Sequence, residues 1–252
     1  MIRVLFDHAL FLPFLVLVLV AAYDVGHRLT VGVVSDYKGR PVESALIGLL
    51  SLLLGFTFSQ TGASYRERLS LIHKEADAVA DCHRFATILP AVHRNQLRKS
   101  IHDYLTLKAK QYNDAQRGVP ENPGEASLML AQRAIYAAPE NPKLDMKLRC
   151  ELYVRCNHIV QMHFQGFYSR QERIPQMVIA LLVFASTVGA FLVGFSTGVN
   201  QRRIWVVPTV FIVLVTMTVA TIRDLDDPYG GFIMVDFSNM VELRQVLEAS
   251  PS

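Results

Sequence analysis

The chain has 252 residues, of which 51% are hydrophobic, with a mean hydropathy of +0.27 and a formal net charge of +3. Its charge is concentrated between Arg66 and Arg173, a stretch with 17 Lys and Arg residues and 12 Asp and Glu residues. This uneven distribution excludes a single soluble globule and predicts membrane segments on both sides of a water-exposed insert. The insert lacks an arginine-rich run with interleaved aromatic residues, so we expect no nucleic acid partner.

The first apolar segment, Ala9–Tyr23, contains only 15 uncharged residues. A helix needs about 20 apolar residues to cross the hydrocarbon core of a bilayer. This helix must therefore extend back through His8 and Asp7, or lie in a thinned region. Because a basic residue precedes the apolar run and small residues follow it, residues 1–22 also fit a cleaved signal peptide. We predict a retained helix, with cleavage as the alternative.

The second apolar segment, Ser44–Tyr65, is uncharged over 22 residues and is long enough to span a membrane. Apolar residues continue beyond it at steps of three and four: Tyr65, Leu69, Ile72, Ala76, Val79, His83 and Ala86. This periodicity predicts that the second membrane helix runs straight into the insert.

The rest of the insert also has helical periodicity. Pro90 interrupts the pattern, and a second helix follows with one apolar side: Leu97, Ile101, Tyr104 and Leu105. Asp114–Pro120 is expected to be a polar loop. Asn-Pro pairs at Asn122 and Asn141 are typical of helix starts, and the second of these helices is predicted to run to Arg173.

Two more apolar segments follow the insert. Ile174–Gln201 is uncharged over 28 residues and Ile204–Ile222 over 19 residues. The short connection Asn200–Arg203 predicts a tight antiparallel hairpin. The third span also has small residues, Ala185, Gly189, Ala190, Gly194 and Gly198, that let another helix approach closely.

These segments predict an all-α integral membrane protein with four transmembrane helices and a helical cytoplasmic insert between helices 2 and 3. The expected divisions are 1–65, 66–173, 174–222 and a tail, 223–252. Basic residues are more frequent on the side that holds both termini and the insert, which indicates a cytoplasmic location for the insert. A bacterial inner membrane is the expected location.

The sequence indicates neither a catalytic site nor a metal site. It has no Gly-rich phosphate loop, nucleophile elbow or His-Glu-x-x-His motif. Cys156, His158 and His163 have poor spacing for metal ligands, so we expect no metal and no cofactor. Three cysteines without redox or zinc spacing predict no disulfide framework. Acidic residues beside His73 and His83, namely Glu75, Asp77 and Asp81, are interpreted as the solvated face of an amphipathic helix.

Two motifs carry a resemblance to a known family. The segment Ser51-Leu52-Leu53-Leu54-Gly55-Phe56 leads to Tyr65-Arg66-Glu67-Arg68, and Leu225-Asp226-Asp227-Pro228-Tyr229-Gly230-Gly231 follows the fourth span. With the two-span, insert, two-span layout, these resemble the bestrophin-like domain family, four-span membrane proteins similar to bestrophin channels.

The resemblance implies a homo-oligomeric ion channel, expected to be pentameric, with a pore lined by the second span. When the narrow neck of the bestrophin pore is transferred to the matching segment of this chain, it falls at Gly48, Leu52 and Phe56. By the same analogy, the expected permeant ion is an anion such as chloride. The motif after the fourth span comprises Asp226, Asp227, Pro228, Tyr229 and Gly230. It lacks the acidic run that binds calcium in bestrophins, so its aspartates are expected to cap backbone groups.

Two alternatives stay open from the residues themselves. Large apolar side chains four residues apart also occur on lipid-facing helices, so Leu52 and Phe56 alone do not define a pore. A non-conducting scaffold or sensor, which docks a cytoplasmic partner through the basic insert, is the alternative function.

Overall fold

The computed structural model describes residues 8–30, 40–116, 126–140, 144–199, 205–227 and 238–249. These residues form helices without any strand: α2 (His8–Thr30), α3 (Arg40–Phe85), the 3-10 turn η1 (Ala86–Ile88), α4 (Ala91–Gln116), α5 (Ala126–Glu140), α6 (Met146–Gln171), α7 (Gln176–Val199), α8 (Val206–Asp226) and α9 (Ser238–Ala249). Apolar stretches long enough to cross a membrane occur in four of the helical segments. The predicted all-α class with four long apolar helices is confirmed.

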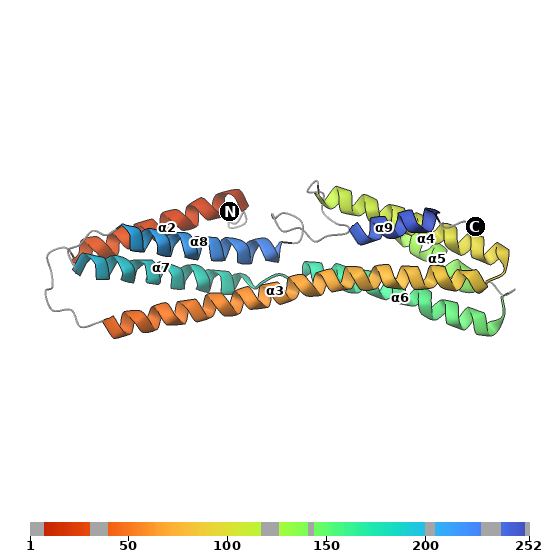
Figure 1. Cartoon of the computed structure of the whole chain (residues 1–252), viewed down its shortest axis with the longest axis horizontal. Coiled ribbons are helices and arrows are strands. Elements are labelled where there is room, and N and C mark those ends of the chain that lie inside the picture. Colours follow the sequence, from red (N-terminus) through yellow and green to blue (C-terminus); the bar gives the residue numbers. More distant parts are fainter. Residues whose placement is uncertain are drawn as a thin grey trace. The chain divides into compact units, whose positions relative to one another are not determined.

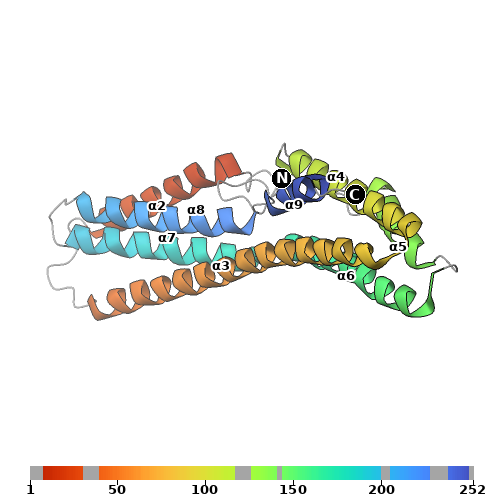
Figure 2. The same ribbon diagram turned by 45° about the vertical axis from the view of Figure 1, so that its right-hand side comes forward.

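The chain divides into two compact units. Unit 1 comprises Met1–Ala63 and Arg173–Asp227, and unit 2 comprises Ser64–Glu172 and Pro228–Ser252. In unit 1, α2, α7 and α8 run alongside one another and alongside the first half of α3 (Figures 1 and 2). In unit 2, the second half of α3 runs beside α6, while α4, α5 and α9 complete the bundle.

Helix α2 extends beyond the apolar run at its C-terminal end. It comprises His8–Thr30 and so continues past Tyr23, whereas the expected extension was back through His8 and Asp7, of which Asp7 lies outside the described residues. The turns of α2 after Tyr23 contain charged residues. Their side chains are exposed and pair with each other: Arg28 Nε lies 2.7 Å from a carboxylate oxygen of Asp24, one helical turn earlier.

Helix α3 is a single helix of 46 residues, which confirms the predicted continuation of the second apolar segment into the insert. Its single proline, Pro41, lies in the first turn, where a helix tolerates proline, and its helical pattern ends where η1 leads to extended backbone at Leu89, just before Pro90. Both the apolar segment and the first part of the insert are therefore helical.

The helix boundaries in the insert differ from the sequence prediction. Helix α4 continues to Gln116, so the first residues of the expected loop, from Asp114, are helical. Helix α6 begins at Met146 because the Asp145 side chain caps it, accepting a 3.1 Å hydrogen bond from the Lys147 N–H. The predicted start at Asn141 is therefore several residues early, while Asn122 lies outside the described residues. The helix ends at Gln171, just before the expected Arg173.

The small residues of α7 pack against α2. A Cβ atom on Gly194 would collide with the backbone of Tyr23, and one on Gly198 would collide with Thr30 and the carbonyl of His27. From the other side, a Cβ on Gly26 would collide with the carbonyl of Phe191. The glycines thus let the two helices approach to backbone contact, as small residues do in membrane helix pairs. The predicted close approach is confirmed, with α2 as the partner; the connection Asn200–Arg203 to α8 lies outside the described residues.

The core of unit 2 joins α3, α4, α5, α6 and α9. Its centre contains Ile72, Val79, Leu97, Ile135 and Leu152, each with at most 1% of its surface exposed. Two of the three free thiols, Cys82 and Cys156, are also buried there. A hydrogen bond with Cys82, together with burial, raises the pKa of the Cys156 thiol, so Cys156 behaves as a small core residue and not as a nucleophile.

Candidate functional site

The first half of α3, which belongs to unit 1, has one side in the apolar core of this unit and one open side. Leu50 and Leu54 are buried in the apolar core of the unit, and the side chains of Thr57 and Thr61 on the same side are buried too. Both hydroxyls donate hydrogen bonds to carbonyls one turn earlier in α3, so they place no unsatisfied polar group in this core.

The three predicted neck residues lie on the open side of α3. At 100° per residue, Gly48, Leu52 and Phe56 fall within about 80° of one another around the helix. Leu52 is 68% exposed and Phe56 is 72% exposed, and nothing lies within 4 Å of the position of a Cβ on Gly48. The structure therefore aligns these residues along one surface, and no other part of the described chain covers them.

This open face differs in composition from the outward faces of the other apolar helices. On α2, α7 and α8 the exposed side chains are mainly large and apolar, including Leu17, Phe184 and Leu214. The open face of α3 combines Leu49, Leu52 and Phe56 with a larger share of small or polar exposed residues: Ser44, Ala45, Gly48, Ser51, Gly55, Ser59, Gln60 and Ala63. Leu46 and Phe58 are also exposed, at the edges of this face. A surface of this kind suits contact with water or a closely packed helix better than contact with lipid tails.

Two aspartates at the end of α8, Asp226 and Asp227, contact the residues just before α7. Asp226, only 9% exposed, accepts a 2.9 Å hydrogen bond from the backbone N–H of Ile174, just before α7. The neighbouring carboxylate of Asp227 lies 3.5 Å from the Arg173 guanidinium. The expected backbone-capping role is therefore seen, but it acts on α7 instead of α8. Pro228, Tyr229 and Gly230 of the same motif lie outside the described residues.

Arg68, in the motif that follows the second apolar segment, also binds the end of a helix. It is 2% exposed, and its guanidinium donates hydrogen bonds to the carbonyls of Ser169 (3.2 Å) and Glu172 (2.7 Å) at the end of α6. Unpaired carbonyls at a helix C-terminus carry partial negative charge, which the guanidinium neutralises.

A buried polar cluster in unit 2 was missed by the sequence interpretation. Glu75 of α3 accepts hydrogen bonds from the Tyr104 hydroxyl and, at 2.9 Å, from the Lys108 ammonium, both on α4. The Lys108 Nζ also lies 3.0 Å from Nδ1 of His163 on α6. All four side chains are at most 5% exposed. The assignment of Glu75 to a solvated face is therefore wrong, although His73 and Asp77 are exposed as expected.

The charges in this cluster are set by their neighbours. Burial alone raises the pKa of Glu75, but the Lys108 ammonium, the adjacent His163 and the hydrogen bond from Tyr104 outweigh it and lower the pKa to about 2. Burial lowers the pKa of His163, and the nearby charges of Lys108 and Arg170 act in the same direction. We therefore assign a charged Glu75–Lys108 pair and a neutral imidazole whose Nδ1 accepts from Lys108.

Acid is expected to destabilise unit 2 in two steps. His163 has a folded-state pKa below its ordinary 6.5, so the unfolded chain takes up this proton first and stability falls as the pH drops below about 6.5. Glu75 adds a second loss between its ordinary pKa of 4.5 and about 2. The check is the melting temperature of the full-length protein across this range. His163→Gln should reduce the first step, and part of the step should remain because burial also lowers the pKa of His83 in this unit. An unchanged profile would contradict the assignment.

The described residues do not gather metal ligands. No group of three or more His, Cys, Asp or Glu side chains among them is arranged to hold a metal ion. Of the residues considered for such a site, His158 is exposed while Cys156 and His163 are buried.

Comparisons with known proteins agree on one family. The sequence profile of the Bestrophin-like domain matches residues 12–240 of the chain. No curated protein matched the sequence. The chain is similar in structure to a bacterial bestrophin homologue from Klebsiella pneumoniae, with 17% sequence identity and a TM-score of 0.67 over 94% of this chain and 95% of that one.

Variants of that homologue give the same result. For one the TM-score is 0.68 with 17% identity, covering 93% of this chain and 96% of the other. For a second it is 0.70 with 16% identity, covering 94% and 95%. The fold extends over nearly the whole length of both proteins.

Proposed function

Because the chain belongs to the bestrophin-like domain family, we propose that it forms a homo-oligomeric ion channel whose pore is lined by the open face of α3. The family and the four apolar helices identify a membrane protein. We further propose a pentamer, four membrane spans and a cytoplasmic insert, placed in a bacterial inner membrane. The pentamer follows from the likeness to bestrophins, and the orientation from the distribution of basic residues.

The composition of the open face of α3 is the observation that carries this proposal. Its small and polar residues tolerate water, and the exposed Leu52 and Phe56 project from the same surface. If several copies place this face around one axis, these two side chains form successive apolar rings, while Gly48 leaves a wider level. Narrow apolar rings expel the water that an ion needs, so the neck is a barrier to conduction that a small widening can relieve.

The permeant is proposed to be an anion such as chloride, by analogy with bestrophins. The neck residues have no charged side chain, so the apolar rings set the height of the barrier more than the sign of the ion. Two polar contacts hold helix ends, each within its own unit. Arg68 binds the end of α6 in unit 2, and Asp226 binds the backbone just before α7 in unit 1.

Ion flux through reconstituted protein tests the proposal. Liposomes that contain the full-length protein are expected to release chloride down its gradient when a potassium ionophore balances the charge, and empty liposomes are not. Replacing chloride with gluconate while keeping potassium separates anion from cation conduction. Absence of flux for either ion from correctly folded protein would contradict the channel.

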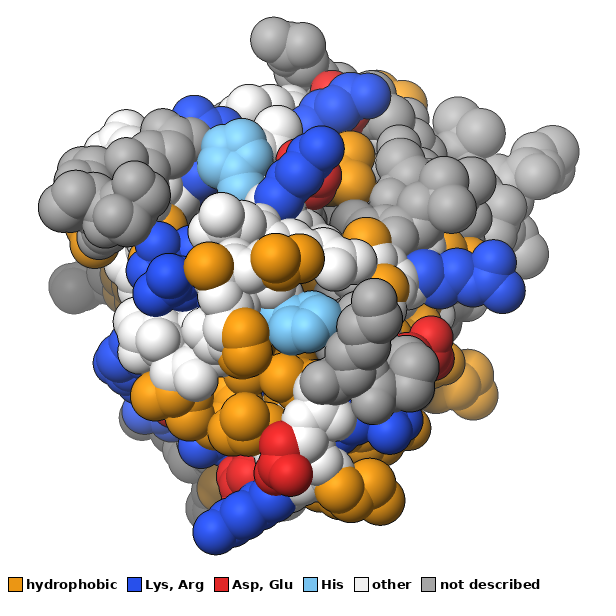
Figure 3. All heavy atoms as spheres, turned by 90° about the vertical axis from the view of Figure 1, so that its right-hand side faces the viewer, with side chains coloured by type: hydrophobic (Ala, Val, Ile, Leu, Met, Phe, Trp, Pro, Cys, Tyr) orange, Lys and Arg blue, Asp and Glu red, His pale blue; other side chains and the backbone are white. Residues whose placement is uncertain are grey.

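The alternative of a scaffold that docks a partner through the basic insert has less support. On the face of unit 2 shown in Figure 3, Lys and Arg side chains are spread among acidic and hydrophobic ones and form no single basic patch. Such a mixed surface is typical of ordinary solvated protein.

A further inference from the structure

In unit 2, helix α6 has an exposed face without a charged side chain. The sequence from Cys156 to Ser169 contains no Asp, Glu, Lys or Arg. Six exposed residues, which we call the α6 strip, lie on this face: Tyr153, Val154, Asn157, Gln161, Gln165 and Tyr168. At 100° per residue they fall within about 120° of one another around the helix, and they extend over about 22 Å of its length.

The other exposed faces of unit 2 are charged. Exposed residues of α4 include Lys99, Asp103 and Lys110, and those of α3 include Lys74 and Asp77. Roughly a quarter to a third of the residues on an ordinary solvated surface are charged. The α6 strip therefore differs from solvated surface, including the rest of the described surface of its own unit.

The one charged residue between Tyr153 and Tyr168, Arg155, is directed away from the strip. Its guanidinium carbon lies 4.5 Å from the centroid of the Phe85 ring, and its Nε lies 3.4 Å from a carboxylate oxygen of Asp81. Both partners belong to α3, so the charge of Arg155 is used inside the unit.

The aromatic side chains of the α6 strip are held by neighbouring rings. The Tyr153 ring centroid lies 5.6 Å from that of Tyr136 on α5, and the Tyr136 hydroxyl donates a 3.0 Å hydrogen bond to Asn157. Tyr168 stacks on Phe164, one turn earlier. Both tyrosines of the strip are still more than half exposed. Side chains fixed in this way lose less entropy when a partner binds, and aromatic residues without charge are typical of the centre of a protein interface.

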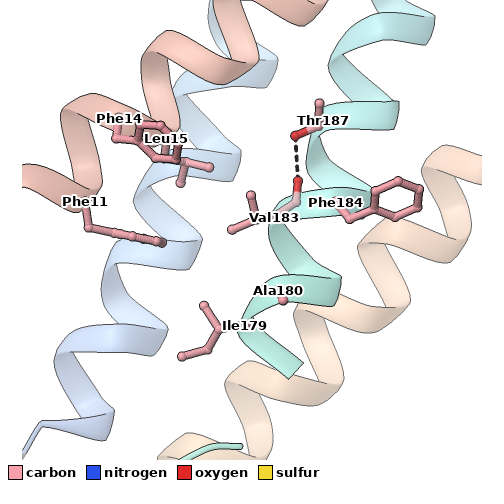
Figure 4. Close-up of a pocket in the computed structure, with 8 residues that line it drawn as sticks. All are labelled: Phe11, Phe14, Leu15, Ile179, Ala180, Val183, Phe184 and Thr187. Atoms are coloured by element: carbon pink, nitrogen blue, oxygen red, sulfur yellow. Dashed lines mark hydrogen bonds between the residues drawn. The ribbon is translucent and has the colours of Figure 1, made fainter. Parts of the chain in front are cut away.

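Lipid accounts for exposed apolar surface in unit 1 but not for the α6 strip. Unit 1 has an apolar cavity of about 380 Å³ between α2 and α7, two helices long and apolar enough to span a membrane, with Phe11 and Ile179 among its lining residues (Figure 4). Hydrocarbon suits that lining. The α6 strip instead includes three amide side chains, which would lose their hydrogen bonds to water in hydrocarbon without replacement. A protein surface is the partner that suits it.

The charge of the insert favours a second copy of the chain as this partner. The insert has 17 Lys and Arg residues against 12 Asp and Glu residues, so identical inserts repel one another. An uncharged contact surface adds no like-charge pair to this repulsion. A different protein attracted by the basic insert would be acidic, and the α6 strip has no cation to bind it.

The size of the α6 strip also favours a second copy. With a length of about 22 Å and the width of one helix, it offers roughly 250 Å². A stable interface between two separate proteins buries about 800 Å² on each partner. A strip of this size is too small to recruit a protein alone, but it is sufficient as an added contact between copies that other surfaces already hold together.

We propose that the α6 strip is a contact surface between neighbouring copies of this chain. The inference rests on the proposed homo-oligomeric channel, and it states where in unit 2 the copies touch. In a closed ring such contacts are heterologous, so the strip meets a different surface of the neighbouring copy. Its amides and tyrosine hydroxyls supply hydrogen bonds there without adding charge.

Site-specific photo-crosslinking in bacterial membranes tests the proposal. Gln161 is replaced in the full-length protein by the photoreactive residue p-benzoyl-phenylalanine, the membranes are irradiated, and the adduct is identified by mass spectrometry. We expect a covalent dimer of this chain. The same residue at Gln96, which is exposed on α4, is the control and should give several-fold less dimer. Gln165 is the second test position if the Gln161 variant does not accumulate.

A charge placed in the α6 strip gives an independent measurement. Gln161→Lys should raise the protein concentration at which half of the detergent-solubilised oligomer dissociates by about tenfold, because the new ammonium loses water in the contact. Gln96→Lys adds the same charge on α4 and should leave this concentration unchanged. Mass photometry of a dilution series measures both.

The outcomes separate this inference from the proposed channel. An adduct with a different protein, or an intact oligomer that gives no adduct at Gln161 and Gln165, would overturn the α6 contact and leave the channel proposal standing. Equal dissociation of Gln161→Lys and the parent would do the same. A monomeric parent protein would overturn both proposals.

Discussion

Truncation of the neck, Leu52→Ala with Phe56→Ala, is expected to raise single-channel conductance several-fold and to lengthen the open periods. Both side chains are more than two-thirds exposed on the open face of α3, so their removal leaves no cavity inside the chain. If they form apolar rings around a pore, their loss widens the narrowest level and lets water, and therefore ions, enter. Planar-bilayer recordings of purified protein measure both quantities.

The matched control for the neck is Leu17→Ala with Leu214→Ala. These leucines are 65% and 59% exposed on α2 and α8, so the control removes comparable apolar surface from other outward faces. Conductance in this control is expected to equal that of the parent. Neck truncation that leaves the recordings unchanged would show that Leu52 and Phe56 do not line the conducting path.

Lys108→Met is expected to lower the free energy of unfolding of unit 2 by about 3–5 kcal/mol. The substitution keeps a long apolar stem but removes the ammonium that neutralises Glu75, which is 1% exposed. A lone carboxylate is then left in the core, where it must take up a proton or draw in water. For a domain of this size the apparent melting temperature should fall by roughly 10 °C or more, measured on the full-length protein in detergent.

Three comparisons separate this effect from a general loss of charge. Arg84→Met breaks an exposed pair with Asp81 in the same unit and should change the free energy by less than about 1 kcal/mol. Glu75→Leu added to Lys108→Met should restore part of the loss, because no charge remains unpaired. Adding Tyr104→Phe to these two changes should restore more of the free energy of unfolding, because it removes the hydroxyl whose acceptor, Glu75, is gone. Equal losses for Lys108→Met and Arg84→Met would contradict a buried ion pair.

The four apolar helices and the continuity of α3 could be predicted because their signals are local. Length and hydropathy are sufficient to indicate a membrane span, and three- and four-residue steps of apolar residues indicate one uninterrupted helix up to Pro90. The start of α6 was less predictable, because Asn141-Pro142 and Asp145 both fit a helix start within a few residues.

The buried cluster could not be predicted because its members are far apart in sequence. Glu75 lies among charged residues that are exposed, and only its position one turn from Ile72 and Val79 indicated the packed side of α3. Its partners Lys108 and His163 come from two other helices, and no local spacing relates them to Glu75. Sequence reasoning weighed His163 only as a metal ligand.

The pairing of α7 with α2 depended on the same kind of distant information. Small residues on α7 showed that a helix could approach closely, but not which one. The matching small residue, Gly26, lies in turns of α2 that follow the apolar run, beside Asp24 and Arg28.

The proposed pore requires that the open face of α3 surrounds an axial path. The most direct test is a cryo-electron microscopy structure of the full-length protein in lipid nanodiscs, read for subunit number and for the residues that face the axis. We expect a closed ring, with five copies of α3 around a continuous path and its narrowest levels at Leu52 and Phe56. A monomer or dimer, or a ring in which these side chains contact lipid, would contradict it.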